Sequence, residues 1–202
     1  MRIETEAIVV AVRPHGEHGA IVAALTPSDG LQAGYVRGGR SRRLRPVLMP
    51  GNIVHAEYRA RSEIQLSQLS VDLTHSRAAL LGEPLAAAAV DWISALTASA
   101  LPEGQPYPAL YAGLGGLFDA IEAAPSARPW TAALARYELL VLAELGFGLE
   151  AREMGSLERW PDVRRALALS GTRLARDLLI GRRADTLAAR GRLLDRLDRI
   201  EG

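Results

Sequence analysis

Hydrophobic and polar residues alternate along the first third of the chain. Residues 3–13 are rich in β-branched side chains, with Ile8, Val10 and Val12 on one predicted face. Four further short apolar runs follow, at residues 20–26, 31–36, 53–59 and 63–73. Alternation with a period of two is typical of strands that bury one face. Turn sequences such as Pro27-Ser28-Asp29-Gly30 separate the runs, so we predict five β-strands joined mostly by tight turns.

The period of the pattern changes near residue 73. Beyond Thr74 apolar residues recur every three or four positions, and prolines or glycines stand near the ends of most segments. This spacing is typical of amphipathic helices. Five helices are expected, over residues 85–100, 108–121, 130–145, 161–180 and 185–200. Their apolar stripes need a common core, which predicts a helical bundle.

These elements predict an α+β protein with two domains. Five short strands within about seventy residues is the size of an OB-type β-barrel, and an SH3-like barrel is the alternative. We expect the five-stranded barrel in residues 1–73 and the C-terminal α-helical bundle in residues 74–202. One side of an OB barrel is commonly open to oligonucleotides, which makes the barrel the candidate nucleic-acid-binding domain.

A cluster of arginines follows the third predicted strand. Nine consecutive residues contain no lysine and no acidic residue but five arginines, namely Arg37, Arg40, Arg42, Arg43 and Arg45. Each cation that neutralises a phosphate releases a condensed counterion, so such a loop is attracted to a nucleic-acid backbone. The alternative is a basic loop that is merely solvated.

Aromatic side chains are scarce beside this loop. Within residues 1–61 only Tyr35 and Tyr58 carry a phenyl or indole ring, so stacking on bases is limited to two sites at most. We therefore expect binding that is mainly electrostatic and tolerant of sequence. Tyr35 and Arg13 complete the candidate nucleic-acid-binding set.

The composition excludes several kinds of chemistry. The net charge is +1, yet residues 1–61 and 151–202 are basic and residues 62–150 are acidic, which suggests separate nucleic-acid and protein-facing parts. All 24 basic residues are arginine and there is no cysteine, so lysine mechanisms, thiol nucleophiles, disulfides and cysteine zinc sites are ruled out. A reducing cytoplasm is the expected setting. No secretory leader and no membrane-spanning stretch is expected.

Two short motifs lack the context that a ligand site needs. His15-Gly16-Glu17-His18 lies in a predicted turn and offers too few ligands for a metal. Gly146-Phe147-Gly148 follows a helical segment rather than a strand, which favours a helix C-terminus over a dinucleotide site. Without a nucleophile elbow or a convincing pair of carboxylates, we expect no enzymatic activity and no cofactor.

An ordered series of segments resembles a known family. A strand over residues 5–12 leads into Arg13-Pro14-His15-Gly16-Glu17, and the third strand leads into a basic R-G-x-R-x-x-R-L segment over residues 37–44. This series is similar to the N-terminal OB domain of the bacterial RecO family of DNA repair proteins. Residues 136–147 are similar to that family's F-E-L-x-L-L-x-x-L-G-Y segment.

The resemblance implies a recombination mediator. RecO proteins bind single- and double-stranded DNA, anneal complementary strands, dock on the acidic C-terminal tail of single-stranded-DNA-binding protein (SSB), and work with RecR to load RecA. Many members bind zinc through four cysteines after the L-G-Y segment, but residues 150–159 contain none, so the zinc segment is expected to be absent. The resemblance also implies that the protein is cytoplasmic and associated with the nucleoid. A protein-binding scaffold and an RNA-binding factor are the alternatives.

The resemblance also implies a partner surface in the helical half. An acidic tail with a hydrophobic end requires an apolar groove with cations at its rim, and residues 62–150 contain only three arginines against ten acidic residues. We therefore expect the tail between helices of the C-terminal half. The candidate partner-binding residues are Arg136, Arg152, Arg159, Trp160, Arg164 and Arg165.

Overall fold

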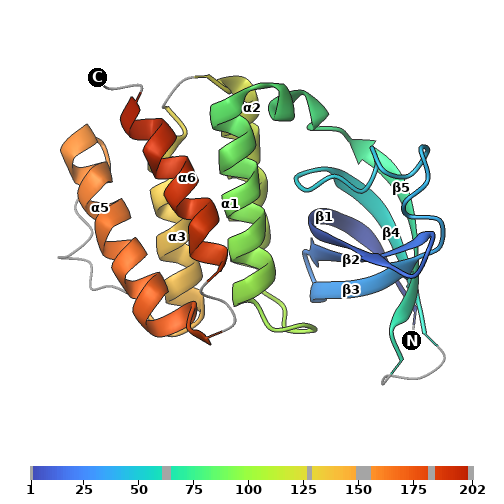
Figure 1. Cartoon of the computed structure of the whole chain (residues 1–202). Coiled ribbons are helices and arrows are strands. Elements are labelled where there is room, and N and C mark those ends of the chain that lie inside the picture. Colours follow the sequence, from blue (N-terminus) through green and yellow to red (C-terminus); the bar gives the residue numbers. More distant parts are fainter. Residues whose placement is uncertain (1, 61–64, 127–128, 149–155, 182–184, 200–202) are drawn as a thin grey trace.

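The computed structural model describes residues 2–60, 65–126, 129–148, 156–181 and 185–199 (Figure 1). Its N-terminal part is a closed barrel of five strands, and helices follow it. This confirms the predicted α+β architecture, an OB-type barrel followed by a helical bundle. The helices stand together on one side of the barrel (Figure 1).

The five strands lie close to their predicted positions. They are β1 (Arg2–His15), β2 (Gly19–Thr26), β3 (Gly30–Val36), β4 (Ile53–Arg59) and β5 (Ser67–His75). Around the barrel the order is β1-β2-β3-β5-β4, and all neighbours are antiparallel except the short β3–β5 pair. The fifth strand was predicted over residues 63–73. It begins at Ser67, because Leu66 precedes the ladder and is 45% exposed, whereas residues 61–64 lie outside the described part.

Strand β1 closes the barrel because it pairs with two partners. Its first half, Arg2 to Ile8, pairs with β4, and its second half, Ile8 to His15, pairs with β2. A β-bulge lies between Val9 and Ala11 in the pairing with β2. A bulge inserts one unpaired residue and bends the strand, which lets one strand serve both neighbours.

Both faces of β1 are buried next to this bulge. Ala7 and Val9 pack inside the barrel, whereas Ile8 and Val10 face outward into the core shared with the helices. Val12 packs with the interior cluster instead. The prediction that Ile8, Val10 and Val12 share one face was therefore wrong, because the bulge shifts the alternation by one residue.

All five predicted helices are present. They are α1 (Pro84–Ala100), α2 (Pro108–Ala123), α3 (Thr131–Glu144), α5 (Trp160–Arg173) and α6 (Thr186–Arg199). A 3-10 turn (η1, Ala78–Gly82) precedes α1, and a π-helical turn (η2, Leu174–Leu178) extends α5. Within the described residues no helix is both long and apolar enough to cross a membrane.

A single apolar core runs from the outer surface of the barrel through the helices. Helix α1 packs against β1 and against α6, and α3 packs against α2 and α5. Leu25 and Leu31 of the barrel belong to the same buried cluster as Trp92 of α1 and Trp130, both fully buried. These two tryptophans are core residues.

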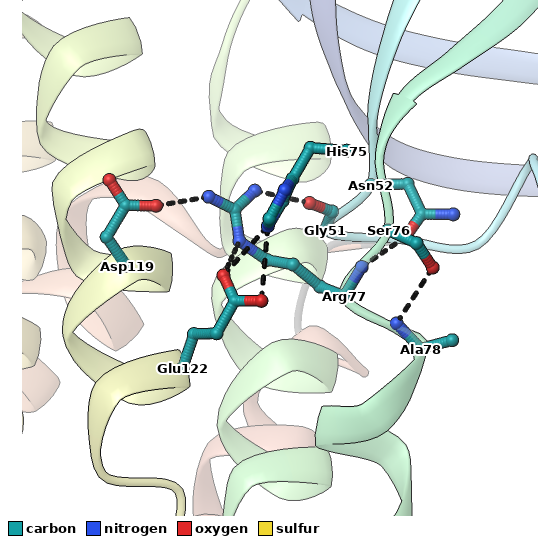
Figure 2. A network of polar contacts seen from close by, with 8 residues as sticks. All are labelled: Gly51, Asn52, His75, Ser76, Arg77, Ala78, Asp119 and Glu122. Atoms are coloured by element: carbon teal, nitrogen blue, oxygen red, sulfur yellow. Dashed lines mark hydrogen bonds and ion pairs between the residues drawn. The ribbon is translucent and has the colours of Figure 1, made fainter.

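The buried guanidinium of Arg77 joins the barrel to α2 (Figure 2). Its side chain is 2% exposed, and Nη1 donates to the Gly51 carbonyl oxygen at 2.8 Å. Nη2 donates to the carboxylate of Asp119, Nε lies 3.4 Å from Oε2 of Glu122, and the guanidinium lies over the Phe118 ring at 5.4 Å. A buried charge is tolerated only when it is paired and hydrogen-bonded, as this one is.

Asn52 connects this junction to the arginine loop. Its buried side chain accepts a hydrogen bond from the Arg77 backbone N–H at 2.9 Å (Figure 2). Its Nδ2 donates to the carbonyl oxygens of Pro46 at 2.8 Å and Val47 at 3.1 Å. Asn52 therefore links the end of the loop to Arg77, which binds α2.

A second buried charge ties four helices together. Glu138 of α3 is fully buried, and Arg190 of α6 donates from Nε to Oε1 at 2.9 Å and from Nη2 to Oε2 at 2.8 Å. Trp92 of α1 donates from Nε1 to Oε1 at 2.8 Å, and the Ser170 hydroxyl of α5 donates to Oε2. Every lone-pair direction of this carboxylate is thereby used.

Glu138→Ala should destabilise the protein by about 3–5 kcal/mol, because it leaves the Arg190 charge buried without its partner. The matched control is Asp91→Ala, which breaks the exposed Asp91–Arg192 pair between α1 and α6 and should cost about 0–1 kcal/mol. Urea unfolding followed by circular dichroism measures both. Equal losses for the two variants would contradict the structural role of Glu138.

Candidate nucleic-acid interface

The arginine loop is a compact series of turns between β3 and β4. Backbone hydrogen bonds run from Ser41 N to Gly38 O at 2.8 Å and from Arg45 N to Ser41 O at 3.0 Å. Gly38 has a φ of 68°, in the region that favours glycine. Leu44 and Leu48 pack onto the interior cluster of the barrel. These apolar anchors leave the five arginines of the loop, Arg37, Arg40, Arg42, Arg43 and Arg45, exposed.

Arg40 fastens the loop to the β1–β2 hairpin. Its Nη1 donates to the Glu17 carbonyl oxygen at 3.0 Å and lies 3.5 Å from that of Gly16. Its backbone N–H donates to His18 O at 3.1 Å. Arg40 therefore has a structural role that the sequence did not reveal, while Nε and Nη2 stay available to a ligand.

The other four arginines of the loop have free guanidinium groups. Arg37, Arg42, Arg43 and Arg45 make no side-chain hydrogen bond or ion pair with the described part of the chain. A free guanidinium offers five N–H donors in a planar arrangement that matches a phosphate. The loop therefore presents at least four cations to a polyanion.

Arg13 and Tyr35 lie on one face of the neighbouring sheet. Arg13 is paired with Ile21, and Ile21 with Tyr35, so the three side chains are aligned across β1, β2 and β3. The Tyr35 ring meets the ring of His15 edge-on, with centroids 5.8 Å apart. Sequence reasoning placed His15 in a turn and gave it no role on this face.

Gly19 provides the space for the Tyr35 ring. A Cβ atom at this position would lie 2.3 Å from Cε2 of Tyr35, far closer than a real contact allows. The pairing of His15 with Gly19 at the end of the hairpin explains why the three residues meet. Tyr35 is only partly buried, so it remains accessible to solvent.

Tyr58 does not belong to the interface. It is fully buried in the barrel, where burial raises the pKa of its hydroxyl above the ordinary value. Of the two tyrosines that could have stacked on bases, only Tyr35 is therefore accessible. This leaves the interface even more dependent on charge than the sequence indicated.

A small groove separates α5 from α6 and contains two of the predicted partner-binding residues. Its volume is about 180 Å³, and Trp160 and Arg164 line it. The opposite wall comes from α6, which the sequence analysis did not select. The residues of that wall are Arg190, Leu194, Leu197 and Asp198, a set with the spacing of one helix face.

The remaining partner-binding candidates lie outside this groove. Arg159 is exposed and pairs with Asp162 at 3.2 Å, whereas Arg164 pairs across the groove with Asp198 at 3.5 Å. Arg165 is exposed on α5 and Arg136 is exposed on α3, and the groove lining includes neither. Arg152 lies outside the described residues.

The structure assigns ordinary roles to the two short motifs. Glu17 and His18 are exposed in the hairpin turn, and across the described residues no group of three histidine or acidic side chains could hold a metal ion. Gly146 follows α3 with a φ of 83°, and Phe147 N donates to Leu142 O at 2.7 Å. That geometry is a glycine C-cap, as predicted.

Comparisons with known proteins agree with this architecture. Residues 1–77 match the family described as "Recombination protein O N terminal", and residues 81–156 match "Recombination protein O C terminal". "DNA repair protein RecO" of Rhodospirillum centenum is 44% identical over 146 residues, which cover 72% of this chain and 57% of that protein.

Two further relatives carry the same name. The protein of Phenylobacterium zucineum is 42% identical over 74% of this chain and 61% of its own length. The protein of a Ruegeria species is 36% identical over 95% of this chain and 74% of its own. The chain therefore spans less than two thirds of the length of the Rhodospirillum centenum and Phenylobacterium zucineum proteins.

Arg40→Ala should loosen the arginine loop, because it removes the hydrogen bonds to the hairpin carbonyls. Amide exchange of residues 38–45 should become about fivefold faster, as expected for one exposed hydrogen bond of about 1 kcal/mol. Arg42→Ala, which removes an equal charge without a partner, is the control and should leave exchange unchanged. Hydrogen–deuterium exchange detected by mass spectrometry measures both.

Proposed function

This chain belongs to the RecO family of DNA repair proteins, and from that premise we propose that it is a recombination mediator. It binds single- and double-stranded DNA, anneals complementary strands, and together with RecR assists the loading of RecA onto SSB-coated DNA. The single observation that carries the proposal is the arginine loop, with its four free guanidinium groups beside Tyr35 and Arg13. The proposed place of action is the cytoplasm, at the nucleoid.

The geometry supports binding to the backbone rather than to base sequence. Guanidinium groups on a loop without carboxylates bind phosphates wherever they occur along a strand. Such binding also favours annealing, since neutralised phosphates repel each other less while most bases stay free to pair. One accessible tyrosine cannot hold many bases away from a complementary strand.

The chain is proposed to act without covalent catalysis. The described residues contain no cluster that could hold a metal ion, and the sequence has no lysine to bind nucleotide phosphates. Annealing by charge neutralisation needs neither a metal nor ATP. We propose a corresponding division of labour, with DNA bound by residues 1–73 and protein partners by residues 74–202.

The α5–α6 groove is the proposed docking site for the acidic tail of SSB. Trp160, Leu194 and Leu197 offer an apolar surface, and the Arg164 guanidinium lies at the same groove. An acidic peptide with an apolar end would place its hydrophobic side chain in the groove and its carboxylate on Arg164, in competition with Asp198.

Replacing Arg37, Arg42, Arg43 and Arg45 with glutamine should weaken DNA binding and lower its salt dependence. With about 0.7 counterion released per single-strand phosphate contact, the slope of log affinity against log salt should fall by roughly 2 to 3. Fluorescence anisotropy on random-sequence oligonucleotides at several salt concentrations measures this slope.

The control for this variant changes the same number of charges in the helical half. Arg173, Arg176, Arg192 and Arg196 replaced with glutamine should leave the slope within experimental error. An unchanged slope in the loop variant would refute the proposed interface, and a preference for matched RNA over DNA strands would favour an RNA-binding factor.

Arg164→Ala should weaken binding of a labelled acidic SSB-tail peptide about five- to tenfold, because one charge-assisted hydrogen bond is lost. Arg165→Ala is the matched control, since it removes an exposed arginine one position away that does not line the groove. Its affinity should stay within about twofold. Equal effects of both variants would place the tail elsewhere.

A further inference from the structure

A pocket lies between the arginine loop and the end of the β1–β2 hairpin. Its volume is about 420 Å³, within the range of cavities that take small ligands. Val12, Ala20 and Leu48 come from the interior cluster of the barrel and give it an apolar base. Pro14 and Met49 contribute further apolar lining nearer to solvent.

The pocket is held in shape by contacts already described. The loop backbone lies directly on β2 here, because a Cβ on Gly39 would lie 2.8 Å from Cβ of Ala20. Arg40 binds the hairpin carbonyls on one side, and Asn52 binds the carbonyls of Pro46 and Val47 on the other. A ligand would therefore enter a preformed site and pay little for ordering it.

The only charged residues that line this pocket are Arg40 and Arg45. No carboxylate shares the lining, and the Arg45 guanidinium has no partner among the residues that the structure describes. The matching ligand carries an apolar body next to negative charge. A nucleotide within a single strand has this chemistry, with a flat base between two phosphates.

We propose that this pocket receives one unstacked base of a DNA single strand while Arg40 and Arg45 bind the flanking phosphates. The inference rests on the proposed DNA binding and adds to it the place where a base is held. Arg40 and Arg45 belong to the same basic segment as Arg37, Arg42 and Arg43, so a strand bound by the loop comes within reach of the pocket. An acidic peptide would lack this continuity.

The pocket also gives the protein a way to distinguish single strands from duplexes. Bases in a duplex are stacked and paired, and extruding one costs a few kcal/mol. A base in a flexible single strand enters at little cost. Duplex DNA therefore binds through the loop alone, and a single strand binds through the loop and the pocket.

The test compares oligothymidylate of about 12 nucleotides with a chain of equal length whose bases are replaced by abasic sites, which keeps the phosphates constant. The full chain should bind the intact strand about tenfold more tightly than the abasic one.

The double variant Val12→Met/Pro14→Leu fills the pocket without changing its charge. It should reduce the ratio of intact to abasic affinity to about twofold and leave the salt slope unchanged. Val71→Met, on the other side of the loop, is the control and should keep the full ratio.

A photo-cross-link tests the same inference in the unaltered protein. A strand that carries 4-thiothymidine should cross-link to Met49 or Pro50, as located by mass spectrometry. Cross-links confined to Tyr35 or to the helices would overturn the inference, and so would equal binding of intact and abasic strands. So would a pocket-filling variant that binds DNA normally but loses an acidic peptide. Absence of any single-strand binding would instead refute the proposed function itself.

Discussion

The buried guanidinium of Arg77 is the contact on which the arrangement of the two halves depends. Burying a charge costs several kcal/mol unless partners are supplied, and here they come from both sides of the junction: the Gly51 carbonyl from the barrel, and Asp119 and Glu122 from α2. If α2 moved away, the buried Arg77 guanidinium would lose its two carboxylate partners. Through Asn52 the same junction fixes the end of the arginine loop. The position of the arginine loop therefore depends on the junction between the barrel and the helices.

The helices also decide which part of the barrel surface is open to a ligand. The outward side chains of Ile8, Val10, Leu25 and Leu31 are buried in the core shared with the helices. Only the far end of the β1–β2–β3 face, around Arg13 and Tyr35, stays accessible beside the loop. The accessible part of this face is thus restricted to one end, next to the exposed arginines of the loop.

Much of this structure is visible in the sequence because it depends on local patterns. The strands and helices follow from the period of the apolar residues, and the loop is identified by its density of arginines. What escaped prediction depends on contacts between distant residues. The bulge next to Val9 moves Val12 to the interior of the barrel. Arg40 binds a hairpin more than twenty residues away in the sequence. The groove between α5 and α6 forms only when the bundle packs. No local pattern signals such pairings. The start of β5 was misplaced for a simpler reason, since alternation continues beyond the hydrogen-bonded ladder.

The double pairing of β1 has a consequence for the order in which the chain assembles. The first half of β1 has no pairing partner until β4 has been synthesised. The second pairing partner of β3 is β5, which is synthesised later still. Pairings between such distant segments are slow to form, because the loop-closure entropy is lost before any contact compensates for it. During synthesis β1, β2 and β3 can form a meander early, but its outer face remains without a cover until α1 emerges. Ile8, Val10, Leu25 and Leu31 then form an exposed apolar surface on a growing chain, and surfaces of this kind favour aggregation until they are covered.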